Sequence, residues 1–175
     1  SINVALPEIG EHFKMGAVTL SWVTTIYLLS AAVFLIPFGK LADIYGRKRI
    51  FIYGISIVSL SSLLAVFAPN TLLFMALRVF QGFGSAMIFG TAIAIITSVF
   101  PKSERGKAMG INVASVYIGL TLGPFAGGIL TNQFGWESIF LVIAPLGIAV
   151  VLLSIISLKQ EWAEAKYERF DWQGS

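Results

Sequence analysis

The chain alternates between long apolar stretches and short polar ones. Five stretches contain no Asp, Glu, Lys or Arg: 15–39, 50–77, 79–101, 108–136 and 138–158. Each is long enough for a helix of about 20 residues, which crosses a hydrocarbon core of roughly 30 Å. The dipeptide Pro69-Asn70 divides the second stretch, because it favours a tight turn between antiparallel helices. The pattern predicts six helices, the first truncated, over these ranges: before Pro7, 16–39, 50–68, 72–99, 108–131 and 137–158.

Composition places this pattern in a membrane. The chain is 57% hydrophobic and 12% charged, whereas soluble domains carry about 25% charged residues. We therefore predict an all-α membrane protein in which residues 1–158 form a six-helix bundle. The sequence has no cysteine and no nucleotide-binding loop, zinc motif or nucleophile with its base, so an enzyme or an ATP-driven pump is not indicated. The lone His12 falls in an outer connection and is expected to be solvated.

The positive charges gather in alternate polar regions. The basic residues of three regions are Lys40, Arg47, Lys48 and Arg49; Lys102, Arg105 and Lys107; and Lys159, Lys166 and Arg169. The regions between them, 8–14, 69–70 and 131–137, hold one Lys and no Arg. By the positive-inside rule, the loops 40–49 and 101–107 and the C-terminus face the cytoplasm of a multi-pass plasma-membrane protein. Topology thus explains the pI of about 9.3, and no nucleic-acid partner is inferred.

An internal repeat pairs the second predicted helix with the fifth. Segments 37–51 and 124–140 both contain Pro-Phe, then an aromatic residue, a glycine, three further residues and Ile-Phe. In the predicted topology the two copies end on opposite sides of the membrane, and only the first carries the basic cluster. An inverted repeat of three plus three helices has this arrangement, so we expect one complete six-helix half of a transporter fold.

Residues 39–49 read Gly-Lys-Leu-Ala-Asp-Ile-Tyr-Gly-Arg-Lys-Arg. Gly39 permits close approach of another helix, and Gly46 can adopt the left-handed conformation that ends one. Asp43 falls near a helix C-terminus, where the macrodipole disfavours an acid, so Arg47 at i+4 is expected to pair with it. A generic basic loop would need only the Lys and Arg residues. The pattern resembles the signature loop of the major facilitator superfamily. The resemblance implies a conformational gating role for Gly39, Asp43, Gly46, Arg47, Lys48 and Arg49.

Arg78 is the only charge inside a predicted span. One interpretation is that its side chain snorkels to the outer interface. Gln81 at i+3 and Ser85 at i+7 extend the same helix face, which favours a polar cavity, and Gly82 allows close packing alongside. Residues 78–84 resemble the fourth-helix motif of the same superfamily, which links the arginine to proton or substrate coupling.

Small residues recur along the fifth predicted helix. Gly119, Gly123 and Gly127 are four residues apart, a spacing that lets helices touch backbone to backbone. Pro124 cannot bond to the carbonyl four residues back and predicts a kink, and Gly128 completes the cluster. Many spans contain paired glycines, but the full run Gly-Leu-Thr-Leu-Gly-Pro-Phe-Ala-Gly-Gly resembles the fifth-helix motif of the antiporter branches. That resemblance implies export.

Two further matches resemble the fourteen-helix drug:proton antiporter family. Residues 3–7, Asn-Val-Ala-Leu-Pro, resemble the end of its first-helix motif, and Trp22 with Tyr27 fits its second helix. The membrane acid of the first-helix motif would lie before Ser1. After the last predicted helix, residues 159–175 mix charges with aromatic side chains, which predicts a cytoplasmic, interfacial linker toward a further span.

The resemblance covers nearly the whole chain. It implies the N-terminal half of a secondary active transporter, working by alternating access and exporting drug-like or amphipathic compounds in exchange for protons. A facilitator or symporter importing a small polar solute stays open, as does a non-transporting scaffold or receptor. The expected partners are the lipid bilayer, a small-molecule substrate and the missing C-terminal half. No cofactor or metal is expected, and the proton gradient would supply the energy.

Overall fold

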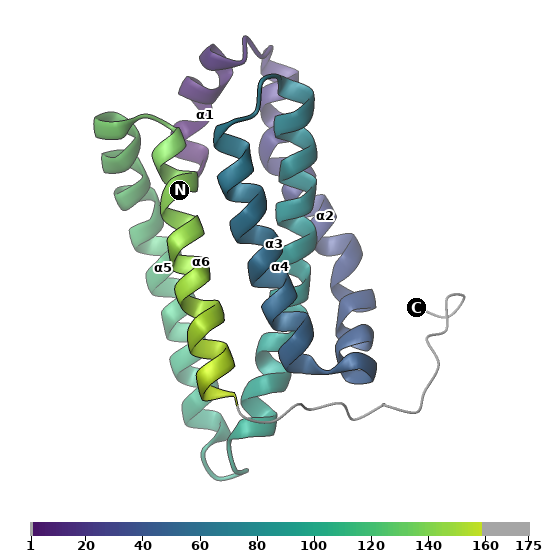
Figure 1. Ribbon diagram of the computed structural model, residues 1–175. Helices are drawn as coiled ribbons and strands as arrows, with labels where there is room; N and C mark the ends of the chain where they lie inside the picture. Colours follow the sequence, from purple (N-terminus) through teal and green to yellow (C-terminus); the bar gives the residue numbers. More distant parts are fainter. Residues whose placement is uncertain (1, 159–175) are drawn as a thin grey trace.

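The computed structural model describes residues 2–158, which fold entirely as helices and short connections (Figure 1). The helices are α1 Ile2–His12, α2 Ala17–Tyr45, α3 Arg47–Val66, α4 Thr71–Val99, α5 Arg105–Phe134 and α6 Glu137–Ser157. Helices α2 to α6 are long and apolar enough to cross a membrane. The chain is therefore the all-α, multi-pass membrane protein that its apolar pattern predicts. The predicted linker 159–175 lies outside the described residues.

The helices extend beyond the charge-free stretches. Helix α2 continues past Gly39 to Tyr45 and α3 begins at Arg47, so the predicted loop 40–49 is helical except at Gly46. Helix α5 likewise begins before its predicted start. The 29 residues of α2 are about 44 Å long, which is enough to cross the headgroup regions as well as the hydrocarbon. The charges therefore mark where a helix enters the headgroups and not where it ends.

Helix α1 runs through Pro7, where the sequence predicts its end, to His12. The proline removes one helical hydrogen bond. The following turn buries apolar surface, because Ile9 is fully buried and a Cβ on Gly10 would lie 3.3 Å from Leu20. Packing against α2 thus outweighs the local break.

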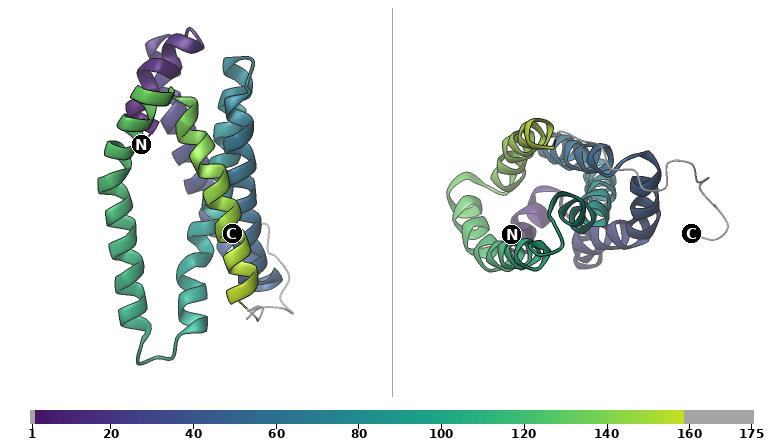
Figure 2. Two further views of the ribbon diagram at one scale, coloured as in Figure 1. Left: turned by 60° about the vertical axis from the view of Figure 1, so that its left-hand side comes forward. Right: turned by 90° about the horizontal axis from the view of Figure 1, so that it is seen from below.

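Helix α4 lies between α2 and α3, and α6 packs on α3 (Figures 1 and 2). Glycines allow these helices to approach one another closely. A Cβ on Gly82 would lie 2.4 Å from the carbonyl oxygen of Tyr27 in α2, and a Cβ on Gly54 or Gly84 would lie 2.7 Å from the other's carbonyl oxygen. Only residues without a side chain allow such backbone contact, so α2, α3 and α4 form one closely packed group.

Helix α5 stands apart from this group along most of its length (Figure 2). It contacts α1 and α6 and has few contacts with α4. Between 110 and 126, every residue except Asn112 and Gly123 is exposed. Its apolar sides are therefore available to lipid or to another helix.

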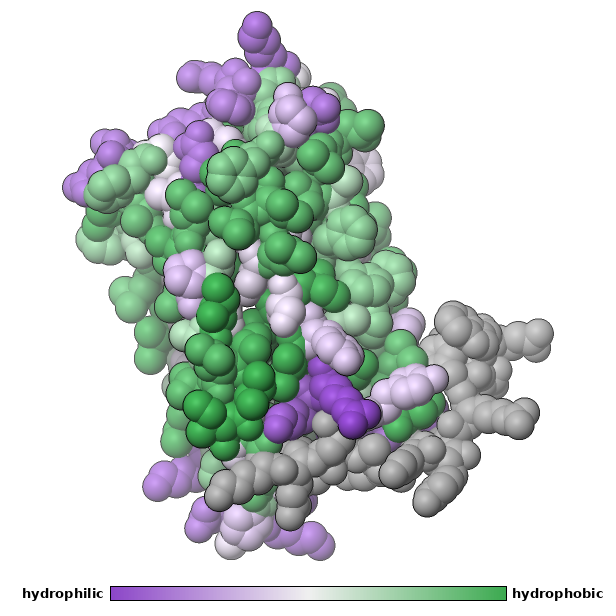
Figure 3. All heavy atoms as spheres, viewed as in Figure 1, coloured by the Kyte–Doolittle hydropathy of each residue, from purple (hydrophilic) through white to green (hydrophobic). Residues whose placement is uncertain are grey.

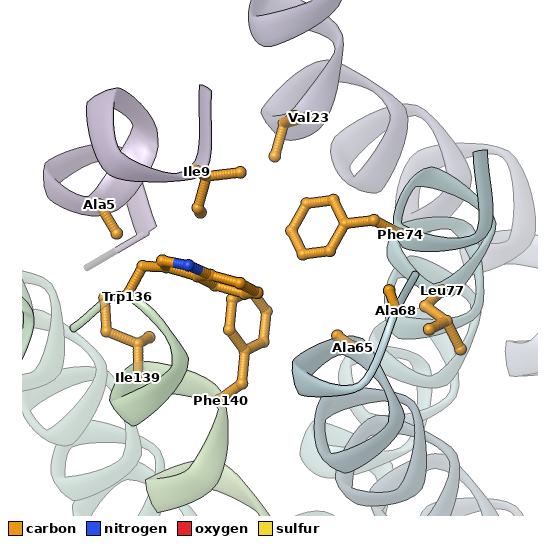
Figure 4. Packing of buried hydrophobic residues seen from close by; sticks show 10 residues of the cluster. All are labelled: Ala5, Ile9, Val23, Ala65, Ala68, Phe74, Leu77, Trp136, Ile139 and Phe140. Atoms are coloured by element: carbon orange, nitrogen blue, oxygen red, sulfur yellow. The ribbon is translucent and has the colours of Figure 1, made fainter. Parts of the chain in front are cut away.

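The largest apolar cluster joins α1, α2, α3, α4 and α6 at one end of the bundle (Figure 4). Trp136 makes edge contacts with Phe74 and Phe140, at centroid distances of 5.8 and 5.9 Å, a geometry that aromatic pairs favour. His12 is exposed but is not in a connection as predicted: it ends α1, and its ring lies 5.2 Å from that of Trp136.

The α2–α3 turn and the α5–α6 turn lie at opposite ends of the bundle (Figure 1), and each contains a glycine, Gly46 or Gly135. Gly46 has φ 112° and Gly135 has φ 80°, values that L side chains rarely adopt. Each donates its N–H to the carbonyl four residues back, that of Ala42 or Thr131, at 2.9 Å. The two glycines hold equivalent places in the predicted repeat, and the correspondence is what an inverted repeat requires.

Candidate functional site

Arg78 lies inside the bundle, where 6% of its surface is exposed. Its Nε donates to the carbonyl oxygen of Val23 at 3.1 Å, and Nη1 donates to Oε1 of Gln81. Its guanidinium carbon lies 4.5 Å from the ring centroid of Tyr27, within the range of a cation–π interaction. A backbone carbonyl, an amide and an aromatic face together hold this charge.

The partners of Arg78 are themselves bonded across helices. Nε2 of Gln81 donates to Oγ of Ser62 in α3 at 3.0 Å, and the hydroxyl of Tyr27 donates to Oγ of Ser85 at 3.0 Å. A snorkelling side chain keeps its charged head in water, whereas this guanidinium is enclosed among α2, α3 and α4. The predicted group Arg78, Gln81 and Ser85 is thus one buried network, and its role in coupling stays a prediction.

Sequence reasoning missed three members of this network, which are Tyr27, Ser62 and the carbonyl of Val23. Ser62 is fully buried, and it ends a run of three serines at 59, 61 and 62 within an apolar helix. Because buried polar groups are nearly always paired, that run was the available signal. A backbone carbonyl carries no such signal, since any residue provides one.

The corner between α2 and α3 carries the second predicted group. Arg47 is buried, and its Nε donates to Oδ1 of Asp43 at 2.9 Å, with Nη2 of the same side chain 2.8 Å from that oxygen. The predicted i,i+4 pair is therefore present. Nη1 of Arg47 also donates to Oγ of Ser98 at 2.7 Å, in the last turn of α4. A cation at this end of α4 is favourable because the helix macrodipole is negative there.

The other predicted residues of segment 39–49 lie around this pair. Gly90 of α4 approaches Gly39, since a Cβ on Gly90 would lie 3.3 Å from the backbone nitrogen of Gly39. Lys48 donates from Nζ to the carbonyl oxygen of Leu158, just beyond α6. Arg49 is exposed beside it. The segment thus touches the ends of both α4 and α6.

The third predicted group, on α5, does not form one uniform face. Gly127 is buried, and a Cβ on Gly128 would lie 3.7 Å from a side chain of α1. Gly123 is half-buried, Pro124 is exposed, and a Cβ on Gly119 would meet nothing within 4 Å. The structure does not bring this group to Arg78 or to the α2–α3 corner.

Helix α4 carries residues of both the Arg78 network and the α2–α3 corner. Arg78, Gln81, Gly82 and Ser85 lie in its first half, and Ser98, the partner of Arg47, lies in its last turn. A change in the position of α4 would therefore affect both the Arg78 network and the contact with Arg47. Among residues 2–158, no three His, Cys, Asp or Glu side chains are grouped so that they could hold a metal ion.

Comparison with known proteins agrees with this architecture. The similar proteins include Multidrug resistance protein Stp of Mycobacterium tuberculosis, 38% identical over 174 residues, which are 99% of this chain and 32% of that protein. Riboflavin transporter RibZ of Clostridioides difficile is 36% identical over 173 residues, 99% of this chain and 38% of that protein. Drug efflux pump JefA of Mycobacterium tuberculosis is 35% identical over 175 residues, 99% and 34% of the two chains.

The chain spans roughly a third of the length of these relatives. All three are named as transporters or resistance proteins and not as enzymes. Residues 1–172 match the family model of the Major Facilitator Superfamily. With five apolar spanning helices and a match over nearly its whole length, the chain belongs to the Major Facilitator Superfamily.

Proposed function

We propose that this chain is the N-terminal half of a secondary active transporter that exports drug-like or amphipathic organic compounds in exchange for protons. The observation that carries the proposal is the enclosed guanidinium of Arg78. An ionised group inside a membrane bundle is costly and is by default a functional-site candidate. Its direct partners lie on α2 and α4, and Gln81 extends the network to Ser62 of α3, so a movement of any of these helices would change its environment.

The corner at Arg47 is the proposed latch for alternating access. Its guanidinium joins Asp43 of α2 to Ser98 of α4. A bond of this kind biases a conformational equilibrium when it exists in one of two states and not in the other. Under the predicted topology the latch closes the cytoplasmic side.

The names of the relatives support export of organic compounds, since one is a drug efflux pump and another a multidrug resistance protein. The second candidate is import of a polar solute, which the similarity to a riboflavin transporter supports. A scaffold or receptor has less support, because neither role explains a buried arginine in a polar network that spans three helices.

Inside-out vesicles containing the full-length protein test the proposal. A respiration-driven proton gradient is followed by a pH-sensitive dye while cationic dyes, neutral antibiotics and riboflavin are added in turn. We expect amphipathic compounds to discharge the gradient with wild-type protein and not with Arg78→Ala. Riboflavin transport without gradient discharge would establish the second candidate instead, and no transport of any compound would favour the scaffold.

A further inference from the structure

An apolar groove runs between α3 and α6 on the face shown in Figures 1 and 3. Its volume is about 260 Å³, and its walls include Ser56, Leu60 and Leu63 of α3 and Ala144, Ile148 and Leu152 of α6. The network of Arg78 and the latch at Arg47 contribute no residue to it. It is therefore a separate feature of the bundle surface.

Close packing of the two helices explains the groove. A Cβ on Gly147 of α6 would lie 1.7 Å from Oγ of Ser59, so the helices touch at a small residue. The larger side chains on either side cannot fill the space outside this contact. Leu60 and Ile148 are each 59% exposed and Leu152 is 55% exposed, so the groove is open toward the membrane.

One end of the groove leads to positive charge. Arg49, Ser56 and Leu63 are seven residues apart and therefore share a face of α3. Arg49 lies about 10 Å before the groove along the helix axis, at 1.5 Å per residue. Lys48 lies beside it and donates to the carbonyl of Leu158 at the end of α6. Figure 3 shows hydrophilic side chains at this lower end, directly below the apolar surface of α3 and α6.

We propose that the groove binds an acyl chain of an anionic phospholipid, with the phosphate near Arg49 and Lys48. The apolar part fits the chain, and the two cations complement the negative headgroup. The distance also fits, because one leaflet contributes roughly 15 Å of hydrocarbon and the groove begins about 10 Å from Arg49. Basic residues at a membrane surface favour anionic lipid by about fivefold each.

The test uses full-length protein in detergent with equal amounts of phosphatidylglycerol and phosphatidylcholine of identical chains. Native mass spectrometry counts the lipids that stay bound. We expect one retained lipid, with phosphatidylglycerol preferred by about 25-fold, because two basic residues each contribute about fivefold. Arg49→Gln should keep a bound lipid and lower the preference to about fivefold, because it removes one of the two positive charges and leaves Lys48 and the groove intact.

Groove-filling variants test the chain site. Ser56 is exposed on the groove wall, so Ser56→Leu and Ser56→Trp should lower retention of both lipids in proportion to the volume added. The matched control is Ala149→Trp, which adds the same indole at an exposed position of α6 outside the groove and should retain lipid as wild type does. Thermal unfolding of each variant shows that it is folded.

Three results would overturn the proposal. Equal retention of the two lipids by wild-type protein would remove the headgroup site. Wild-type retention by a folded Ser56→Trp variant would remove the chain site. A dimer that Ser56→Trp dissociates would assign the groove to a second copy of the chain.

Discussion

Arg78 and Arg47 connect the same three helices near opposite ends of α4. Arg78 of α4 reaches α2 through Val23 and, by way of Gln81, reaches α3 at Ser62. Arg47 of α3 bonds to α2 at its acid partner and to α4 near its last turn. Each arginine presents a planar fork of donors, which can hold several partners in fixed directions. A single arginine thus helps to hold α2, α3 and α4 together at each of two levels along α4.

Replacement of Arg78 by lysine tests whether the fork matters. Arg78→Lys keeps the charge but cannot reach Val23 and Gln81 with the same geometry or stack equally on Tyr27. We expect gradient-driven transport to fall nearly as far as in Arg78→Ala. A hydrogen bond from a charged group contributes about 1.5–3 kcal/mol, so the melting temperature should fall as well.

The matched control is Tyr27→Phe, which keeps the ring over Arg78 and removes only the bond to Ser85. Tyr27→Phe should lower the free energy of unfolding by about 1 kcal/mol. Transport and thermal unfolding are measured on the same preparations. Full activity of Arg78→Lys would mean that charge alone suffices, as the snorkelling interpretation holds.

The latch predicts a different outcome for Asp43→Asn. The amide keeps the shape of the carboxylate and removes its charge, while the bond from Arg47 to Ser98 remains. We expect normal insertion and abundance with turnover reduced by roughly tenfold or more, because the two access states lose their balance. Ser98→Ala should act in the same direction with a smaller effect. Normal turnover in Asp43→Asn would leave the segment with a topological role only.

At the scale of elements, the apolar pattern was sufficient to predict the spanning helices and their order. It was not sufficient to predict their ends, because α2 carries Lys40 and Asp43 into the headgroup region without unwinding. Nor could it predict the bond from Arg78 to Val23, which depends on how closely α4 approaches α2. Gly82 sets that approach, but a glycine in a sequence does not say which helix it meets.

Two glycine substitutions separate internal packing from exposed surface. Gly82→Ala would place a Cβ 2.4 Å from the carbonyl of Tyr27, so α2 and α4 must separate. We expect a loss of about 1–3 kcal/mol of stability, visible as a lower melting temperature. Gly119→Ala adds the same methyl where nothing lies within 4 Å and should leave the melting temperature of the isolated chain unchanged. Equal melting temperatures of the Gly82→Ala and Gly119→Ala variants would contradict the packing described for α4.

Helix α5 yields a prediction about direction of transport. Its glycine run is half-exposed in this chain, and under the proposed function we expect it to contact the other half of the transporter. Gly123→Val in the full-length protein should then separate that contact and open a leak, since packed interfaces do not absorb added volume without displacement. Substrate binding should persist while uphill export is lost. Binding and accumulation are compared in inside-out vesicles, and a variant that loses neither would leave the glycine run as ordinary packing.

At the scale of the whole molecule, the bundle has a closely packed part and an exposed part. Helices α2, α3, α4 and α6 touch at small residues and carry both buried arginines. Helix α5 is exposed along most of its length and turns at Gly135 into the aromatic cluster around Trp136. This division suits a fold in which one part keeps its shape while another surface engages the rest of the protein.

The orientation of the whole bundle is tested at the two ends of α5. Ser103 precedes α5 and Asn132 lies near its end, and both are exposed. This part of the protein contains no natural cysteine, so, in a full-length protein cleared of any others, single substitutions give a clean background. An impermeant thiol reagent added to whole cells should label Asn132→Cys and leave Ser103→Cys unlabelled, and permeabilised cells should show both. The reverse pattern would place the Arg47 latch outside the cell and would contradict both the charge rule and the predicted direction of transport.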